Sequence, residues 1–127
     1  MALIWREGLE RALVNFGNSS VLAVGSHPLG ESWKIGIDNP YLSGKQIGQV
    51  EIRDTSLSTS GNMPSHPRHI LNPFTGEFVT ERKMVSVVAD DPVDAEVLTT
   101  VLMIAGPDKV PGIVSKFNIK EKHIYLL

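Results

Sequence analysis

The sequence has no cysteine, which excludes disulfides, a thiolate nucleophile and zinc–thiolate sites within these 127 residues. It also has no apolar run near the roughly 18 residues that a membrane-spanning helix needs. The 12 Lys and Arg residues are scattered among 14 Asp and Glu residues with no basic block, so no basic stripe could follow a phosphate backbone. These absences favour a soluble protein without a membrane span or a nucleic-acid partner, and we expect it in the cytoplasm.

The composition that is present suits one globular domain over residues 1–127. Hydrophobic residues make up 42% and charged residues 20%, which are ordinary values for a chain that buries a core. The segment "SLSTSG", residues 56–61, is expected to be a strand of small residues or a sheet edge. Apolar β-branched runs and alternating patterns predict further strands at residues 12–17, 20–25, 33–37, 47–52, 84–90 and 123–127.

Two segments of the second half carry helix signals. Asp91 can cap a helix that has Pro92 at its first position, and the apolar pattern runs on to the stop signal Gly106-Pro107. A shorter helix is predicted over residues 108–117. Strands followed by two helices and a final strand define an α+β fold, a two-layer structure in which helices cover one face of an antiparallel sheet.

The N-terminal segment is expected to form a short amphipathic helix around residues 3–12. Charged residues interrupt its apolar residues, which argues against the apolar region of a signal peptide. The apolar residues available to one side of this helix are Leu3, Ile4, Leu9, Ala12 and Leu13.

The helix from Pro92 has only two charged residues before Pro107, Asp94 and Glu96. Glu96 and Thr100 are four residues apart and therefore lie on one stripe of the helix. A carboxylate and a hydroxyl on such a stripe suit a hard cation such as Mg²⁺, which binds few protein oxygens and keeps water or phosphate ligands. The alternative is that Glu96 lies in the first turn because it interacts favourably with the helix dipole, and points to water.

Two other segments carry polar groups that could bind a ligand. Ser58, Thr59, Ser60 and Gly61 combine three hydroxyls with a flexible backbone, which can bind phosphate oxygens but also occurs in edge strands and turns for structural reasons. His69 enters the turn "RHILNPFTGE", where an imidazole could act as a general base, contact a phosphate, or tie down the loop. This turn lies in an unusually long connection between two strands, and such connections often carry function.

The order and residues of these segments resemble the ApbE family, the FAD:protein FMN transferases. In that family a Trp-x-x-x-Ile-x-x-Pro-like strand precedes a Thr-Ser-Gly segment, a His-Ile-x-Asp-Pro-x-Thr-Gly loop and a helix that opens Ala-Asp-x-x-x-Thr. The matching segments here are "WKIGIDNP" (33–40), "TSG" (59–61), "HILNPFTG" (69–76) and "AEVLTT" (95–100), with Gly17-Asn18 in place of the family's Gly-Gly-Asp turn. Four matches in the same order are far more specific than any one of them.

The resemblance implies a two-layer α+β fold related to the tunnelling fold, and an activity that splits FAD and attaches FMN to a Ser or Thr of an acceptor flavoprotein. It implies that Glu96 and Thr100 ligate Mg²⁺ and that His69 is catalytic. The residues that would line the nucleotide site are Thr59, Ser60, Gly61 and His69. Such a reaction is a phosphoryl-group transfer, in which a metal binds the diphosphate and a base assists the attacking hydroxyl.

Departures from the family pattern leave other functions open. Glu96 is one methylene longer than the family's Asp, Asn72 replaces the loop Asp, and the Gly-Gly-Asp turn has lost a glycine and its acid. The chain also resembles only the C-terminal half of the family, so we expect self-association or a partner chain to complete the site, and an exported partner would place it in the periplasm. The alternatives are a catalytically degenerate flavin-binding or scaffolding paralogue, and a metal-dependent hydrolase that uses Glu96 and His69.

Overall fold

The computed structural model describes residues 6–17, 19–65 and 67–127. Antiparallel strands and few helices confirm the α+β class that the sequence predicts. The elements, in chain order, are β1 (Ala12–Phe16), β2 (Ser20–Val24), β3 (Trp33–Asp38), β4 (Gln46–Ile52), β5 (Ser56–Gly61), β6 (Lys83–Ala89), α2 (Pro92–Ile104), α3 (Val110–Val114) and β7 (Glu121–Leu126).

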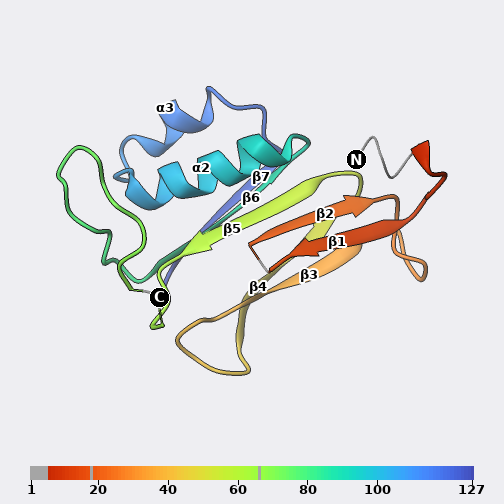
Figure 1. Cartoon of the computed structure of the whole chain (residues 1–127), viewed down its shortest axis with the longest axis horizontal. Helices are drawn as coiled ribbons and strands as arrows, with labels where there is room; N and C mark the ends of the chain where they lie inside the picture. Colours follow the sequence, from red (N-terminus) through yellow and green to blue (C-terminus); the bar gives the residue numbers. More distant parts are fainter. Residues whose placement is uncertain (1–5, 18, 66) are drawn as a thin grey trace.

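The main sheet has five antiparallel strands in the order β1-β2-β5-β6-β7, and α2 and α3 lie on one of its faces (Figure 1). Every residue of β6 is buried, because the strand is covered on both sides. The buried core between the sheet and the helices consists of Ile70, Val85, Val87, Ala89, Ala95, Leu98, Leu102, Met103 and Val110.

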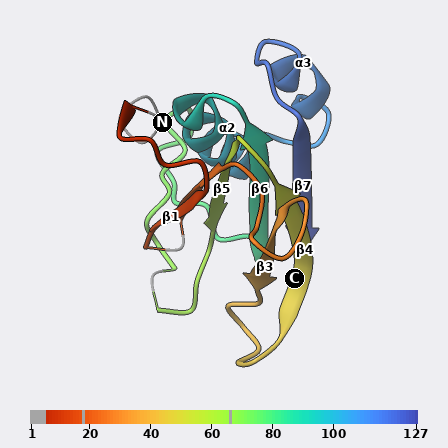
Figure 2. The ribbon, with the colours of Figure 1, turned by 90° about the vertical axis from the view of Figure 1, so that its right-hand side faces the viewer.

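The opposite face of the sheet packs against a separate two-stranded sheet, the hairpin β3–β4 (Figures 1 and 2). Trp33, Ile35 and Ile37 alternate toward this core, as the period-2 pattern of the sequence predicts. The sequence did not show that the hairpin forms its own layer. The buried residues of this second core are Val21, Ala23, Ile37, Val50, Ile52, Leu57, Met84 and Val88.

The start of helix α2 agrees with the sequence signals. The Asp91 carboxylate accepts a hydrogen bond from the Val93 N–H at 2.8 Å, and Pro92 holds the first helical position, where its missing N–H costs nothing. The helix ends at Ile104, just before Gly106-Pro107. Helix α3, at five residues, is shorter than the predicted segment 108–117.

Two expectations are wrong in part. Strand β5 is the central strand of the sheet and not an edge, because β2 and β6 pair with it on either side. Ala12 and Leu13 belong to β1 and Leu9 is 52% exposed, so they form no apolar helix side, while Leu3 and Ile4 lie outside the described residues. Among the described helices, none has the length and hydrophobicity to cross a membrane.

Candidate functional site

Strand β5 directs a row of hydroxyls at helix α2. Side chains alternate between the two faces of a strand, and Leu57 packs into the core on the hairpin side. Ser58 and Ser60 therefore face the helix, where their hydroxyls contact helix residues. A buried strand face with hydroxyls needs polar partners from the layer above it, because an unpaired buried hydroxyl is unfavourable.

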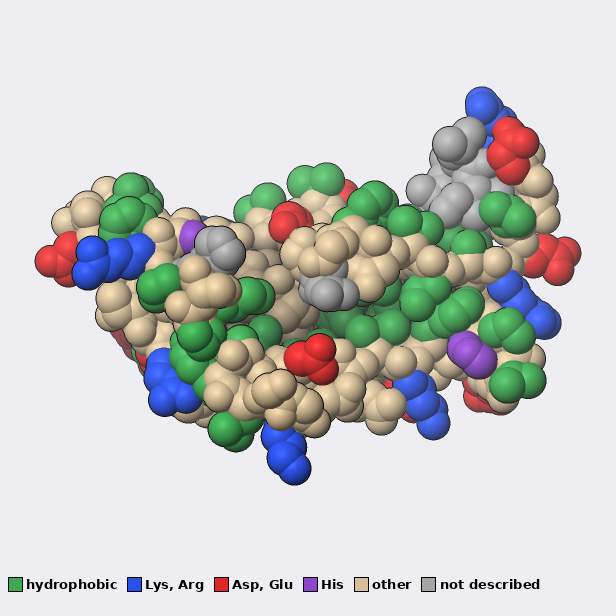
Figure 3. Space-filling model, turned by 60° about the horizontal axis from the view of Figure 1, so that its bottom comes forward, with side chains coloured by type: hydrophobic (Ala, Val, Ile, Leu, Met, Phe, Trp, Pro, Cys, Tyr) green, Lys and Arg blue, Asp and Glu red, His purple; other side chains and the backbone are tan. Residues whose placement is uncertain are grey.

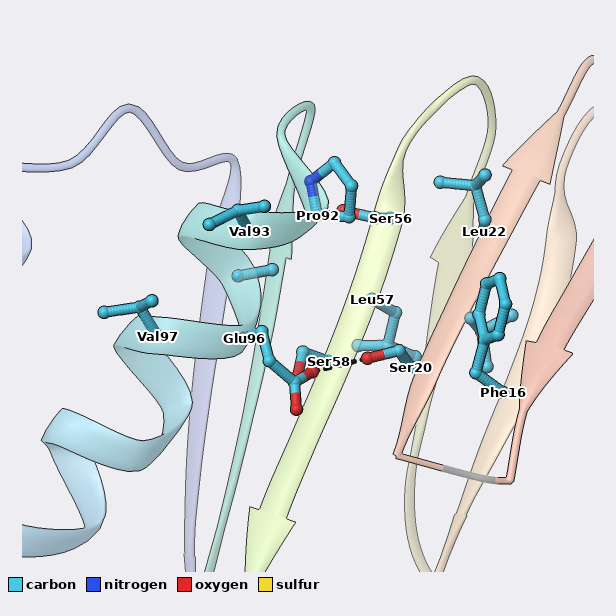
Figure 4. Close-up of a pocket in the computed structure, with 12 residues that line it drawn as sticks. Phe16, Ser20, Leu22, Ser56, Leu57, Ser58, Pro92, Val93, Glu96 and Val97 are labelled. Carbon is cyan, nitrogen blue, oxygen red and sulfur yellow. Dashed lines mark hydrogen bonds between the residues drawn. The ribbon is translucent and has the colours of Figure 1, made fainter. Parts of the chain in front are cut away.

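Glu96 supplies the main partner for these hydroxyls. Its Oε2 accepts hydrogen bonds from the hydroxyls of Ser58 at 2.7 Å and Ser20 at 2.5 Å (Figure 4). Ser20 and Ser58 are directly paired residues of β2 and β5, so their side chains lie next to each other on one face. Glu96 is thus directed toward the sheet from an exposed helix position, which contradicts the alternative that it merely points to water.

Thr99 adds a further hydroxyl beside Glu96, on the core side of the helix. It is fully buried, and its hydroxyl donates to the Glu96 carbonyl oxygen at 3.0 Å. The same hydroxyl lies 2.9 Å from that of Ser60, which can donate to it. Thr100 is exposed one turn after Glu96, and its hydroxyl lies 3.4 Å from the same carbonyl. We name the hydroxyls of Ser20, Ser58, Ser60 and Thr99 the hydroxyl cluster.

The connection that carries His69 is fastened to the end of β5. The Asn62 amide donates to the carbonyls of Val79 and Glu81 at 3.0 and 2.7 Å. Ile70 is buried in the helix-side core, and its carbonyl accepts from the Val79 N–H at 2.8 Å. His69, the neighbour of Ile70, is exposed, so the anchor places an imidazole at the surface beside the sheet.

The sequence predicts a turn after His69, and the structure shows that this turn is tight and hydrogen-bonded. The Asn72 side-chain oxygen accepts from the Phe74 N–H at 2.9 Å, and the Gly76 N–H donates to the Asn72 carbonyl at 2.9 Å. Gly76 has a φ of +71°, a conformation that favours glycine. Asn72 therefore forms the same kind of turn that an Asp would form, without adding a negative charge.

One cavity of about 410 Å³, which we name the polar cavity, is bordered by all six residues that the family resemblance assigns to the site. They come from strand β5, the connection and helix α2, which are distant in the sequence. The lining residues are Ser19, Thr59, Ser60, Gly61, Met63, His69, Ile70, Leu71, Glu96 and Thr100.

The side chain of Thr59 does not face Glu96, and Gly61 has no side chain. The Thr59 hydroxyl lies 3.0 Å from that of its cross-strand partner Ser86, on the hairpin side of the sheet. A Cβ on Gly61 would come within 2.6 Å of Met84 Cγ, so this glycine is required by the close approach of β6. Of the predicted hydroxyls in "TSG", only that of Ser60 lies on the helix side.

Glu96 also borders a second hollow of about 420 Å³, which we name the apolar groove (Figure 4). Phe16 and Val93 are 60% and 64% exposed there. The lining residues are Phe16, Ser20, Val21, Leu22, Ser56, Leu57, Ser58, Pro92, Val93, Ala95, Glu96 and Val97. The Glu96 carboxylate therefore lies between the polar cavity and the apolar groove.

The donors around Glu96 and Thr100 fit a magnesium ion that shares its ligands with a phosphate. Glu96 Oε1 accepts no hydrogen bond from any residue that the structure describes, and a hydroxyl such as that of Thr100 keeps lone pairs after donating. No three described His, Cys, Asp or Glu residues are grouped so that they could hold a metal by themselves. Mg²⁺ commonly takes one or two protein oxygens and completes its shell with water and substrate phosphates.

Charge supports this fit. The residues that line the polar cavity include no Lys or Arg, and Glu96 is negative, so a bare diphosphate would be repelled there. Figure 3 shows a face of the molecule on which Lys and Arg side chains stand apart along the rim while hydrophobic side chains gather in the middle. A divalent cation between carboxylate and diphosphate would remove the repulsion.

These features define an antiparallel α+β protein with a polar cavity built by β5, α2 and the connecting turn. The chain belongs to the ApbE family, whose model matches residues 1–123. Two curated proteins of Klebsiella pneumoniae (strain 342), each described as FAD:protein FMN transferase, are 29% and 31% identical over 88% and 82% of this chain. The chain matches the C-terminal part of these relatives and spans about a third of their length, 34% of each.

Solved structures agree. The flavin transferase ApbE from Vibrio cholerae has a TM-score of 0.75 at 23% identity, covering 98% of this chain and 45% of that chain, which shows the fold. The apo form of the Pseudomonas stutzeri flavinyl transferase ApbE has a TM-score of 0.70 at 26% identity, covering 99% of this chain and 42% of that chain. The family resemblance seen in the sequence is confirmed.

Sequence reasoning missed Ser20, Ser58 and Thr99 as partners around Glu96. A usable signal was present, because serines at alternate positions of "SLSTSG" put three hydroxyls on one strand face. Ser20 carries no such signal. Its role depends on the register between β2 and β5, which brings residues 38 positions apart into a pair.

Proposed function

We propose that this chain provides the C-terminal part of a FAD:protein FMN transferase site. The observation that carries the proposal is that Glu96, Thr100 and His69 border one cavity together with the "TSG" segment. Membership of the ApbE family supports FAD as the substrate and an acceptor flavoprotein as the second substrate.

In this proposal Glu96 and Thr100 hold Mg²⁺, which when bound neutralises charge on the FAD diphosphate. Ser60 and the backbone of Thr59 and Gly61 border the nucleotide on the strand side. His69 faces the diphosphate from the connection and contacts the reacting atoms. Each assignment rests on the position of the residue in the polar cavity.

The proposed reaction moves one phosphoryl group. The acceptor Ser or Thr oxygen forms a bond to the phosphorus that carries the riboflavin moiety, and the bond from that phosphorus to the bridging oxygen of the diphosphate breaks. AMP leaves with the bridging oxygen, and His69 takes the proton of the attacking hydroxyl as general base. A phosphoester of FMN on the acceptor results.

The described residues offer one carboxylate and no cationic side chain in the polar cavity. We therefore propose that further protein completes the flavin site, contributed by a second copy, a partner chain or additional sequence of the same protein. The matched relatives are about three times as long, which supports this requirement. The cytoplasmic location remains a prediction.

The test is a transfer assay with mass detection. The protein, alone and together with a chain that supplies the N-terminal part of a family member, is incubated with FAD, Mg²⁺ and a candidate acceptor, and the intact mass of the acceptor is measured. A mass increase equal to FMN minus water supports the proposal, and EDTA should abolish it. Absence of an adduct under every combination of acceptor and metal would contradict it.

A second candidate is a flavin-binding or scaffolding paralogue without transfer. It is favoured by the Thr59 hydroxyl, which bonds to Ser86 on the far side of the sheet rather than facing the polar cavity. FAD fluorescence titration divides this second candidate, because a flavin-binding paralogue changes the emission of FAD and a scaffold leaves it unchanged.

A further inference from the structure

The exposed side chain of Glu96 is held in one orientation by hydrogen bonds to its carboxylate. Two hydroxyls from two strands donate to the same oxygen, Oε2, while Oε1 accepts no hydrogen bond from the described residues. The backbone behind it is also fixed, since the Thr99 hydroxyl donates to the Glu96 carbonyl and lies 2.9 Å from the Ser60 hydroxyl. The two carboxylate oxygens therefore differ, because Oε2 is held by two hydroxyls and Oε1 is left to bind a ligand.

The protons of these hydroxyls have a single consistent arrangement. Ser20 and Ser58 each have one proton, and both protons are directed at Oε2. The Thr99 proton goes to the Glu96 carbonyl, so the Ser60 hydroxyl donates to Thr99. Every hydroxyl of the cluster thus donates toward Glu96 or toward the residue that holds its backbone.

This arrangement of hydrogen bonds restricts the Glu96 side chain, which is longer than the Asp of the family pattern. Glutamate has one more rotatable bond than aspartate, and a free carboxylate on it would sample many positions. Fixing Oε2 against the sheet removes that freedom and leaves Oε1 as the oxygen that can bind a ligand. Residues of this kind, which orient a metal ligand without touching the metal, commonly tune affinity.

We propose that Ser20 and Ser58 are positioning residues that hold Oε2 of Glu96 so that Oε1 is presented to the divalent cation. This inference rests on the proposed function, in which Glu96 is a metal ligand. It adds two residues that the family motif does not assign to the site.

The experiment measures the affinity for Mn²⁺, a paramagnetic probe for Mg²⁺, by the loss of its free electron paramagnetic resonance signal in the presence of FAD. Ser20→Ala and Ser58→Ala are each expected to raise the Kd for Mn²⁺ on the order of 10-fold. Ser20→Thr keeps the hydroxyl and should restore the affinity. Glu96→Gln should remove the binding that these variants weaken.

Ser56→Ala is the matched control. Ser56 lies on the same strand and face, is equally buried, and donates to the Ala89 carbonyl at 2.6 Å instead of to Glu96. It should lower thermal stability about as much as Ser58→Ala while leaving the Kd for Mn²⁺ unchanged. If Ser58 has a purely structural role, Ser56→Ala and Ser58→Ala should change thermal stability and the Kd for Mn²⁺ by similar amounts. That result would overturn the inference.

The outcomes also separate the inference from the proposed function. If Glu96→Gln loses Mn²⁺ while Ser20→Ala and Ser58→Ala bind as wild type does, only the positioning role is wrong. If the wild-type protein binds no Mn²⁺ with FAD present, or if Glu96→Gln binds as well as wild type, the metal site itself is wrong and the inference falls with it.

Discussion

Helix α2 presents two faces with different surroundings. The face toward the sheet buries Leu98 and Leu102 completely, while Val93 and Val97 on the other face are 64% and 46% exposed. Glu96 lies where the two faces meet, with its carboxylate on the serines of β2 and β5. Apolar contacts therefore fix the helix, and the proposed ligand-binding atoms of Glu96 lie at the border of this contact, where they stay accessible.

In helix α2, different residues pack against the sheet and border the polar cavity, so packing and ligand binding should be separable by mutation. Variants of the buried face should then change stability, and variants of the border should change binding or transfer.

Leu98→Ala should have the largest effect on the buried side. Removing a fully buried leucine leaves a cavity in the helix-side core, and the free energy of unfolding should fall by about 2–5 kcal/mol. Urea unfolding measures it. Val97→Ala, on the exposed face next in sequence, is the control and should change stability by less than about 0.5 kcal/mol. Equal losses in both variants would show that the helix is not held by one face.

His69→Gln should have the largest effect on the border side. Loss of the proposed general base should slow FMN transfer by about 100-fold or more, because positioned acid–base groups contribute 10²–10⁴-fold. The free energy of unfolding should change much less than in Leu98→Ala, since His69 is exposed. His123→Gln on β7, whose ring pairs with Glu121 at 3.1 Å, is the control. Equal rates for His69→Gln and wild type would remove His69 from the mechanism.

The difference between the two faces also marks what the sequence could predict. The capped helix and the strands come from local signals, such as Asp91-Pro92 and the β-branched runs, so they were predictable. The central place of β5 was not, because small residues are typical of edges and turns, and only long-range pairing puts this strand in the middle.

In the candidate site, too, some features were predictable from local sequence motifs and others depend on long-range strand pairing. The family motifs locate Glu96, Thr100 and His69, and the structure brings them to one cavity. The partners of Glu96 depend on register: Ser20 meets Ser58 only because β2 and β5 pair antiparallel at that step. The direction of the Thr59 hydroxyl likewise follows from strand alternation, which a motif alone does not express.

Asn62→Ala should show whether the connection depends on a single buried anchor. Its amide holds the carbonyls of Val79 and Glu81, so the variant leaves both unsatisfied and should cost about 1–3 kcal/mol of stability. It should also slow transfer, because the same connection carries His69. Thermal unfolding and the transfer assay check both effects.

The control for the anchor is Ser56→Ala. Its buried hydroxyl donates to the Ala89 carbonyl at 2.6 Å, and neither residue lines the polar cavity. This variant should lower stability without slowing transfer. A transfer rate that falls as much as in Asn62→Ala would mean that the connection has no special role.

Asp91→Ala should have the smallest effect. It removes the helix cap, the 2.8 Å hydrogen bond to the Val93 N–H, and should lower stability by about 1 kcal/mol. Asp91→Asn keeps a capping oxygen and should recover most of the loss. Urea unfolding of both variants measures the difference, and a loss as large as that of Leu98→Ala would contradict a helix held mainly by its buried face.

The most direct test of the shared site is calorimetric titration of FAD into the protein with and without Mg²⁺. If Glu96 holds Mg²⁺ against the diphosphate, Mg²⁺ should tighten FAD binding to the wild type, on the order of 10-fold, and Glu96→Gln should lose this dependence. FAD binding that is equally tight with and without Mg²⁺, or an equal gain in Glu96→Gln, would contradict a diphosphate site built around Glu96.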